Sequence, residues 1–334
     1  MSRAATSVWF GYDFQANAAI VLMLEHIQDM STIRLEGYED IEIQLNDGSY
    51  VLAQSKAVVD ASTDFRNVRA NSKKAIETLS EASRNLKIHK MVYITNTPNP
   101  FKDTDVGAIY TFSGRAYKKY ADLPPSTKGI ISDLLPDIEQ LIDTAKFEIQ
   151  VLPFESDDDR HKYRYVIYGI SDFIGKLDIT YDGLRNSLHD VWNAALTKSG
   201  TRKNESIKLR KKDIVWPIIV FVTGNGKLNR DAEYCNLLDD GEYNEVSRKY
   251  RRIIDDYSER FEFVTKILYG FSSSGIQGRD RITAYINEHW EEFKSEIGEE
   301  VIDERLQCSL VKIVMFNVLS RRFEIDNIKR YVNL

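Results

Sequence analysis

The chain has 334 residues, of which 43% are hydrophobic and 29% charged, and its net charge is -6. This composition is typical of a soluble globular protein, and the length favours two domains. The negative charge argues against a protein that only coats nucleic acid, because basic side chains supply most of that affinity. It does not argue against a nuclease, since a bound metal partly neutralises a site rich in carboxylates.

Cysteine usage and hydropathy exclude further classes. Cys235 and Cys308 are far apart and have no partner at metal-ligand spacing, so neither a disulfide framework nor a zinc site is expected. The N-terminus lacks the apolar run of a signal peptide. The longest apolar stretch near the C-terminus, 310–319, is interrupted by Lys312 and Asn317 and is too short to span a bilayer. We therefore expect a cytoplasmic protein that has no membrane segment.

The first half of the chain alternates between helical and strand patterns. Its expected elements, in order, are a helix over 13–30, strands over 40–45 and 50–58, a helix over 64–86, a strand over 91–96, a helix over 131–145 and a strand over 147–154. A hairpin followed by helix and strand predicts an α/β fold, with a mixed sheet flanked by helices.

The second half reads as mainly helical. The polar, acidic run 155–160 follows a strand and is the expected boundary between a first domain over 1–157 and a second over 158–334. The expected helices of the second domain cover 182–198, 243–268, 279–297 and 300–320. The apolar run 215–222 is a buried strand or a helix, and periodicity does not decide between them.

The predicted hairpin carries a polar face. Strand side chains alternate between the two faces of a sheet, so Asp40 and Glu42 of the first strand share a face, as do Gln54 and Lys56 of the second. The alternate positions are apolar or small. Whether the two polar pairs meet on one face depends on the register of the hairpin.

The turn decides that register. A two-residue loop would mix polar and apolar side chains on each face of the hairpin. A three-residue loop over 46–48, with Gly48 in the left-handed conformation, keeps the apolar faces matched and is a common connection. We favour this register, which places Asp40 across from Gln54, with Lys56 one step along the same face.

This arrangement suits phosphodiester hydrolysis. Mg²⁺ prefers one or two carboxylates together with waters and substrate oxygens, and Asp40 can be the fixed carboxylate. The side-chain carbonyl of Gln54 can ligate the metal or hold one of its waters, and Lys56 can orient or help deprotonate the attacking water. Glu36 can supply a second acid, whereas Glu42 lies far along the strand. A half-solvated sheet shows the same alternation, so the pattern alone also permits a purely structural role.

These residues resemble a known family. The segments Gly11-Tyr12-Asp13-Phe14-Gln15, Glu36, Glu39-Asp40-Ile41 and Gln54-Ser55-Lys56 resemble the PD-(D/E)XK nuclease superfamily. More closely, they resemble the double-stranded DNA endonuclease domain of bacterial antiphage effectors. Such domains occur with cyclic-nucleotide sensor domains in CBASS systems and beside an SMC-type ATPase in Lamassu systems. The resemblance covers about residues 8–100.

The resemblance implies a restriction-endonuclease-like fold and assigns roles by position. Asp40 matches the first metal-binding acid, and Lys56 matches the catalytic lysine. Gln15 matches a glutamine often found on the first helix, and Glu36 the acid ahead of the hairpin. The implied metal ligands are Asp40, Gln54 and Glu36, and the implied cofactor is Mg²⁺ or Mn²⁺.

Gln54 departs from the family pattern because it stands where a second acid is usual. A neutral amide binds a metal more weakly than a carboxylate does. This leaves open a degenerate site, or one that relies on Glu36 or Glu25.

The resemblance implies a metal-dependent endonuclease of an antiphage defence system that hydrolyses double-stranded DNA. Unregulated cleavage would harm the host, so we expect gating by homo-oligomerisation or by partner subunits. The part of the chain after residue 158 looks small for a cyclic-nucleotide sensor, which favours a Lamassu-like subunit working with an SMC-type ATPase. The alternatives are a degenerate nuclease-fold protein that docks DNA or assembles a complex, and a ribonuclease on the same fold.

Overall fold

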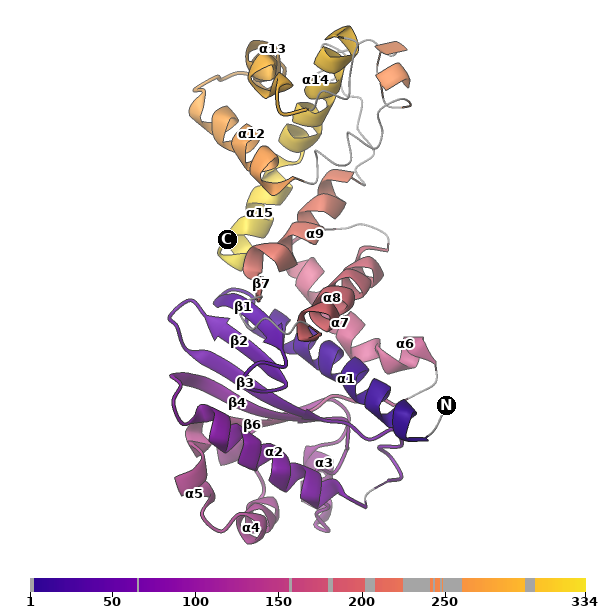
Figure 1. Ribbon diagram of the computed structural model, residues 1–334, viewed down its shortest axis with the longest axis vertical. Helices are drawn as coiled ribbons and strands as arrows, with labels where there is room; N and C mark the ends of the chain where they lie inside the picture. Colours follow the sequence, from indigo (N-terminus) through magenta and orange to yellow (C-terminus); the bar gives the residue numbers. More distant parts are fainter. Residues whose placement is uncertain are drawn as a thin grey trace. The chain divides into compact units, whose positions relative to one another are not determined.

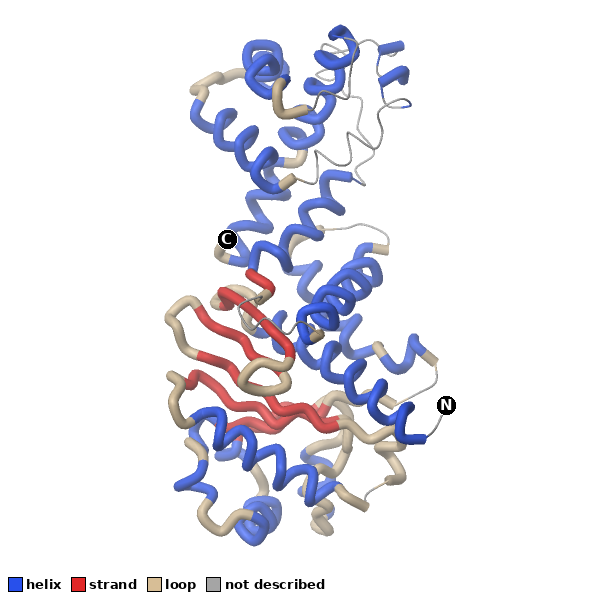
Figure 2. The backbone as a smooth tube through the Cα atoms, viewed as in Figure 1, coloured by secondary structure: helices blue, strands red, loops and turns tan. Residues whose placement is uncertain are grey.

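The structure is a computed structural model. It describes residues 3–64, 66–155, 158–179, 183–201, 208–224, 241–242, 244–246, 248, 260–297 and 304–334. The chain forms two compact units (Figures 1 and 2). The first unit comprises Met1–Asp178 and Asp182–Asp213, and the second comprises Ile179–Tyr181 and Ile214–Leu334.

The first unit is built on a seven-stranded mixed sheet with the order β5-β6-β4-β3-β2-β1-β7. The strands are β1 (Met30–Leu35), β2 (Ile41–Leu45), β3 (Tyr50–Lys56), β4 (Ile88–Thr95), β5 (Ala116–Lys119), β6 (Phe147–Val151) and β7 (Leu209–Arg210). The central strands β3, β4 and β6 run parallel, and the remaining neighbours pair antiparallel. The predicted α/β fold with a mixed sheet flanked by helices is therefore confirmed.

Helices cover both faces of the sheet, with α1 and α2 on opposite sides (Figure 1). The helices of this unit are α1 (Arg3–Glu25), α2 (Val68–Ser83), α3 (Val106–Thr111), α4 (Pro125–Leu134), α5 (Ile138–Leu141), α6 (Asp159–Lys162), α7 (Arg164–Lys176) and α8 (Leu184–Gly200), with short 3-10 turns η1 (Tyr120–Asp122) and η2 (Thr144–Lys146). The expected helix over 131–145 is interrupted, because Pro136 cannot continue α4 and disfavours helical backbone at the residue before it.

Helix α1 is the central element of the first unit. Every residue from Phe14 to Met23 is buried, so this part of the helix is enclosed on all sides. The sheet lies along one side of α1, and α7 and α8 pack against it as well. The predicted helix over 13–30 starts earlier than expected, and the strand β1 that follows it was not predicted.

The first compact unit extends past the boundary that the acidic run suggests at residue 157. Helices α7 and α8 bury apolar side chains beside α1, among them Ile170 and Trp192. A helix that is buried on all sides needs this second cover, so the sheet and these helices share one core. The described chain leaves this unit at Asp213.

The second unit is mainly helical, as expected. It contains α9 (Lys211–Gly224) from Ile214 on, α12 (Phe261–Ser273), α13 (Arg281–Lys294), α14 (Glu304–Ser320) and α15 (Arg322–Val332), with α12, α13 and α15 contacting α14. The apolar run 215–222 lies in helix α9. Half of the expected helix over 243–268, and residues 300–303 of the last one, lie outside the described residues. Among the helices that are described, none is long and apolar enough to cross a bilayer.

Candidate active site

The hairpin formed by β2 and β3 has the predicted register. Ile41 pairs with Ala53, and the backbone nitrogen of Leu45 donates to the oxygen of Ser49 over 2.8 Å. Gly48 has a φ of 77°, the left-handed conformation that the three-residue turn requires. Asp40, directly before β2, is thereby brought opposite the end of β3.

The carboxylate of Asp40 is held in place by β3. Its Oδ2 atom accepts hydrogen bonds from the amide nitrogen of Gln54, from the backbone nitrogen of Ser55 at 2.8 Å and from the Ser55 hydroxyl at 3.0 Å. Lys56 Nζ lies 3.9 Å from the same oxygen. The side chains of Asp40 and Lys56 are 23% and 27% exposed, so both remain accessible to a ligand.

Gln54 acts on Asp40 through its nitrogen. The side chain is buried, and its Nε2 atom donates to the carboxylate of Asp40. In this arrangement Gln54 fixes the orientation of the carboxylate, whereas the sequence suggested that its carbonyl oxygen would face a metal. A carboxylate at this position would lack the proton that this hydrogen bond uses.

Gln15 connects helix α1 to the turn between β1 and β2. Its buried amide nitrogen donates to Glu36 Oε1 at 2.9 Å and to the backbone oxygen of Asp40 at 2.6 Å. Glu36 has a φ of 54°, an uncommon left-handed conformation for a residue with a side chain. The predicted residues Gln15, Glu36 and Asp40 therefore belong to one hydrogen-bonded group.

A pocket of about 320 Å³ opens at this group. Four of the five predicted site residues line it, namely Gln15, Glu36, Asp40 and Lys56, and Gln54 supports Asp40 from outside the lining. The remaining wall comes from α1 and from the end of β3: Ser7, Val8, Gly11, Tyr12, Ser55 and Ala57. One wall of the pocket therefore carries carboxylates and an ammonium group, and the other wall is formed by helix α1.

The other two acids weighed for the site are engaged elsewhere. Glu42 is buried and binds Lys208 Nζ at 2.5 Å. Glu25, at the end of α1, pairs with Arg115 at 3.2 Å and accepts from Gln150 at 3.1 Å. Neither lines the pocket.

Glu39, which precedes Asp40 in the sequence, is a titratable residue to which the sequence pattern assigned no role. Its side chain is buried, and its Oε1 atom has no hydrogen-bond partner among the described residues. Burial raises the pKa of Glu39 to about 8, and the adjacent charge of Asp40 adds to this rise. Glu39 precedes the strand, so no alternation pattern points to it.

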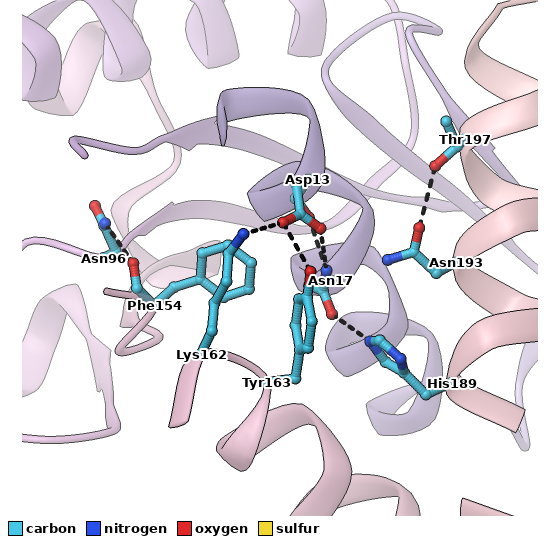
Figure 3. Close-up of polar contacts among 9 residues, drawn as sticks. All are labelled: Asp13, Asn17, Asn96, Phe154, Lys162, Tyr163, His189, Asn193 and Thr197. Atoms are coloured by element: carbon cyan, nitrogen blue, oxygen red, sulfur yellow. Dashed lines mark hydrogen bonds and ion pairs between the residues drawn. The ribbon is translucent and has the colours of Figure 1, made fainter. Parts of the chain in front are cut away.

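The side of α1 away from the pocket is held by a second polar group (Figure 3). Asp13 accepts hydrogen bonds from Lys162 and, at 3.1 Å, from the hydroxyl of Tyr163. Asn17 donates to Asp13 Oδ1 at 3.0 Å, and its own oxygen lies 2.8 Å from Nε2 of the buried His189. Because Asp13 and Asn17 flank Gln15 in the sequence, α6 and α8 help to set the position of the helix that carries Gln15.

The donor set is compatible with a hard divalent cation. Asp40 Oδ1 and Glu36 Oε2 accept no hydrogen bond from a described residue, and both side chains line the pocket. Two carboxylates with waters and substrate oxygens suit Mg²⁺ or Mn²⁺. Within the described residues no group of three or more His, Cys, Asp or Glu side chains is placed to hold a metal, so the protein would supply only part of the coordination.

No protein-family model, no curated protein and no solved structure matches this chain. The function is therefore inferred from the geometry of the pocket and from the resemblance of the short motifs around it.

Proposed function

We propose that this protein is a metal-dependent endonuclease that hydrolyses DNA phosphodiester bonds in the pocket beside Asp40. The observation that carries the proposal is that Glu36 and Asp40, from the turn between β1 and β2, meet Lys56 of β3 in one pocket. Two carboxylates and an ammonium group suit metal-dependent phosphodiester hydrolysis, since the carboxylates can hold a metal and the ammonium group can stabilise developing negative charge.

Each residue has a role that follows from its contacts. Asp40 and Glu36 would hold Mg²⁺ or Mn²⁺, which when bound polarises the phosphate and stabilises its developing charge. Lys56 lies at the long distance of 3.9 Å from Asp40, so its ammonium group can turn toward a phosphate oxygen or orient the attacking water. Gln54 holds Asp40 and Gln15 holds Glu36, so both act by positioning.

The biological setting is proposed from the motif resemblance. It supports an effector of a bacterial antiphage system acting in the cytoplasm on double-stranded DNA. A Lamassu-like assembly with an SMC-type ATPase is the arrangement we favour, with activity gated by that partner or by homo-oligomerisation. A helical second unit, to which we assign no chemistry, is available for such contacts.

A plasmid-cleavage assay tests the proposal. Wild-type protein, alone, as an assembled oligomer and with its partner subunits, is incubated with supercoiled plasmid and Mg²⁺ or EDTA. We expect nicked and linear products that EDTA abolishes. Lys56→Ala and Asp40→Asn should slow cleavage by about 100-fold or more, because the first removes a cation that stabilises developing charge and the second a carboxylate that would hold the metal. Lys74→Ala, an exposed lysine on α2, is the matched control and should cleave normally.

Absence of cleavage in all three forms would overturn the enzyme proposal. Cleavage of an RNA of the same sequence, with duplex DNA left intact, would replace it with a ribonuclease. Both outcomes are read from the same gel.

A degenerate nuclease fold that docks DNA is the second candidate, and the contact between Gln54 and Asp40 favours it. In the family pattern a second acid is usual at this position, whereas here a neutral amide occupies it. Calorimetric titration with Mn²⁺ separates the two candidates. Heat of binding that is lost in Asp40→Asn supports the enzyme, and DNA binding without metal binding supports the docking protein.

A further inference from the structure

A glycine in the interior of α1 leaves open space at the pocket. Glycine destabilises a helix interior relative to alanine, so its presence calls for a reason. A Cβ atom built at Gly11 would meet no packing atom of the described chain within 4 Å. Gly11 is half-buried and lines the pocket, so the space above it is part of the pocket. No described neighbour requires glycine here, but a ligand lying against the helix would.

An aromatic ring stands beside this open space. Tyr12 lines the pocket and is 51% exposed, and the neighbouring Trp9 is 69% exposed. Large aromatic side chains left in water next to a pocket indicate a surface that another molecule covers. The opposite wall carries Lys56 and the carboxylates of Asp40 and Glu36. If a divalent cation offsets the two carboxylates, Lys56 leaves this wall able to take an anion, and an occupant that fits both walls presents a flat apolar face close to an anionic group.

We infer that the pocket takes a single unstacked nucleotide, with its base against Tyr12 above Gly11 and its phosphate toward Lys56. The inference rests on the proposed nuclease function and specifies its substrate. A base supplies the flat apolar face and a phosphate the anion. The volume of about 320 Å³ is at the small end of ligand pockets, roughly 300–1,000 Å³, so it suits one nucleotide rather than a duplex.

The consequence concerns the kind of DNA that is cut. A base inside a duplex is stacked on both faces and cannot reach Tyr12 unless it leaves the stack. Extrusion requires least free energy where the base is mismatched, unpaired or near a frayed end. The enzyme should therefore prefer duplexes that contain such a defect over fully paired duplexes of the same sequence.

The test uses two pairs of variants and two substrates. The two substrates have the same sequence: one is a fully paired duplex, and the other contains a single unpaired base. Both are incubated in Mg²⁺ with the protein and with any partner that its activity requires. Tyr12→Leu removes the stacking ring and Tyr12→Phe keeps it. Gly11→Leu fills the open space. Gly129→Leu, at an exposed and equally open position of α4, is the control for Gly11→Leu.

We expect the wild type to cleave the defective duplex with a kcat/KM at least fivefold higher than the paired one. Tyr12→Leu should raise KM for the defective duplex by about 5- to 150-fold, the range of base–aromatic stacking, and leave kcat nearly unchanged. Tyr12→Phe and Gly129→Leu should behave as wild type. Gly11→Leu should lose cleavage while its melting temperature stays at or above that of the wild type, because a better helix former replaces glycine.

Two results would overturn the inference while leaving the nuclease intact: Gly11→Leu and Tyr12→Leu cleaving as wild type, or equal cleavage of the two duplexes. If no form of the wild type cleaves, the proposed function fails. The nucleotide pocket is then tested by oligonucleotide binding alone. Fluorescence anisotropy with a labelled single-stranded 12-mer in Ca²⁺ then compares wild type with Tyr12→Leu. Weaker binding by the variant supports the nucleotide pocket, and equal binding overturns it.

A protein interface is the rival occupant of this surface. Sedimentation of wild type and Trp9→Ala measures self-association. A dimer that is lost in Trp9→Ala, together with unchanged oligonucleotide binding in Tyr12→Leu, would assign the surface to a second copy of the chain and overturn the inference.

Discussion

The amide nitrogen of Gln54 donates a hydrogen bond to the carboxylate of Asp40. Through this contact Gln54 stabilises the charge of the Asp40 carboxylate. The contact also shows what a glutamate would change, because two carboxylates in contact repel unless a cation lies between them.

Gln54→Glu should therefore lower the melting temperature in EDTA and recover most of the loss in Mg²⁺. The loss arises because the hydrogen bond disappears and a second negative charge faces Asp40. The recovery arises because a ligand that binds only the folded state stabilises it by mass action. Differential scanning fluorimetry with and without 10 mM Mg²⁺ measures both effects. Gln54→Met is the control, since it removes the hydrogen bond without adding charge. Equal Mg²⁺ responses in Gln54→Glu and wild type would show that position 54 does not face the metal.

Asn17→Ala should destabilise the fold by about 2–3 kcal/mol, because it leaves the buried His189 and Asp13 each short of a hydrogen-bond partner. Urea unfolding followed by circular dichroism gives the free energy of unfolding. Asn193→Ala on α8, where the side chain is only half-buried, is the matched control and should cost well under 1 kcal/mol. Equal losses for the two variants would contradict a special role for the contact between α1 and α8.

His26 should make the protein sensitive to acid. Burial lowers the pKa of His26 to about 4 from its ordinary value of 6.5, with smaller contributions from Lys90 and His89. Between these pH values the unfolded chain binds a proton that the folded chain does not, so stability falls as the pH drops from 6.5 to about 4. The full effect amounts to about 3 kcal/mol.

His26→Phe should remove this part of the pH dependence, because the variant has no group to protonate at that position. Melting temperatures recorded from pH 7 to pH 4 for wild type and variant provide the comparison. His161→Gln, which replaces an exposed histidine, should keep the wild-type slope. Parallel curves for wild type and His26→Phe would refute the assignment.

Gly48→Ala should lower stability by about 1–2 kcal/mol, since alanine is strained at the φ of 77° that the hairpin turn imposes. Gly48→Asn should cost less, because asparagine tolerates the left-handed conformation better. Thermal unfolding of the two variants shows which substitution costs more stability. A smaller loss for alanine than for asparagine would mean that the turn does not hold this conformation.

The register of the hairpin could be predicted from the sequence because the information is local. Alternating apolar residues and the turn chemistry at Gly48 both select the same pairing, and that pairing brings Asp40 to β3. The same reasoning predicted the mixed sheet and the helical second half. It could not foresee how far the first unit extends, since the packing of α7 and α8 beside α1 is a long-range contact.

The site could be predicted only in part. Four of the five expected residues line one pocket, yet the sequence does not reveal that Gln54 would turn its nitrogen toward Asp40. The buried carboxyl of Glu39 also escaped prediction, because burial of a loop residue depends on what packs over it. The open space above Gly11 is visible only in three dimensions.

The left-handed backbone of Glu36 sets fold stability and cleavage against each other at this position. Glycine, and to a lesser degree asparagine, fit a φ of 54° with less strain than glutamate does. A library of variants at position 36 that is sorted for thermal stability alone should therefore enrich glycine and asparagine. The same library sorted for cleavage should instead enrich aspartate and glutamate. Glutamate at this position supplies a carboxylate against the preference of the local backbone.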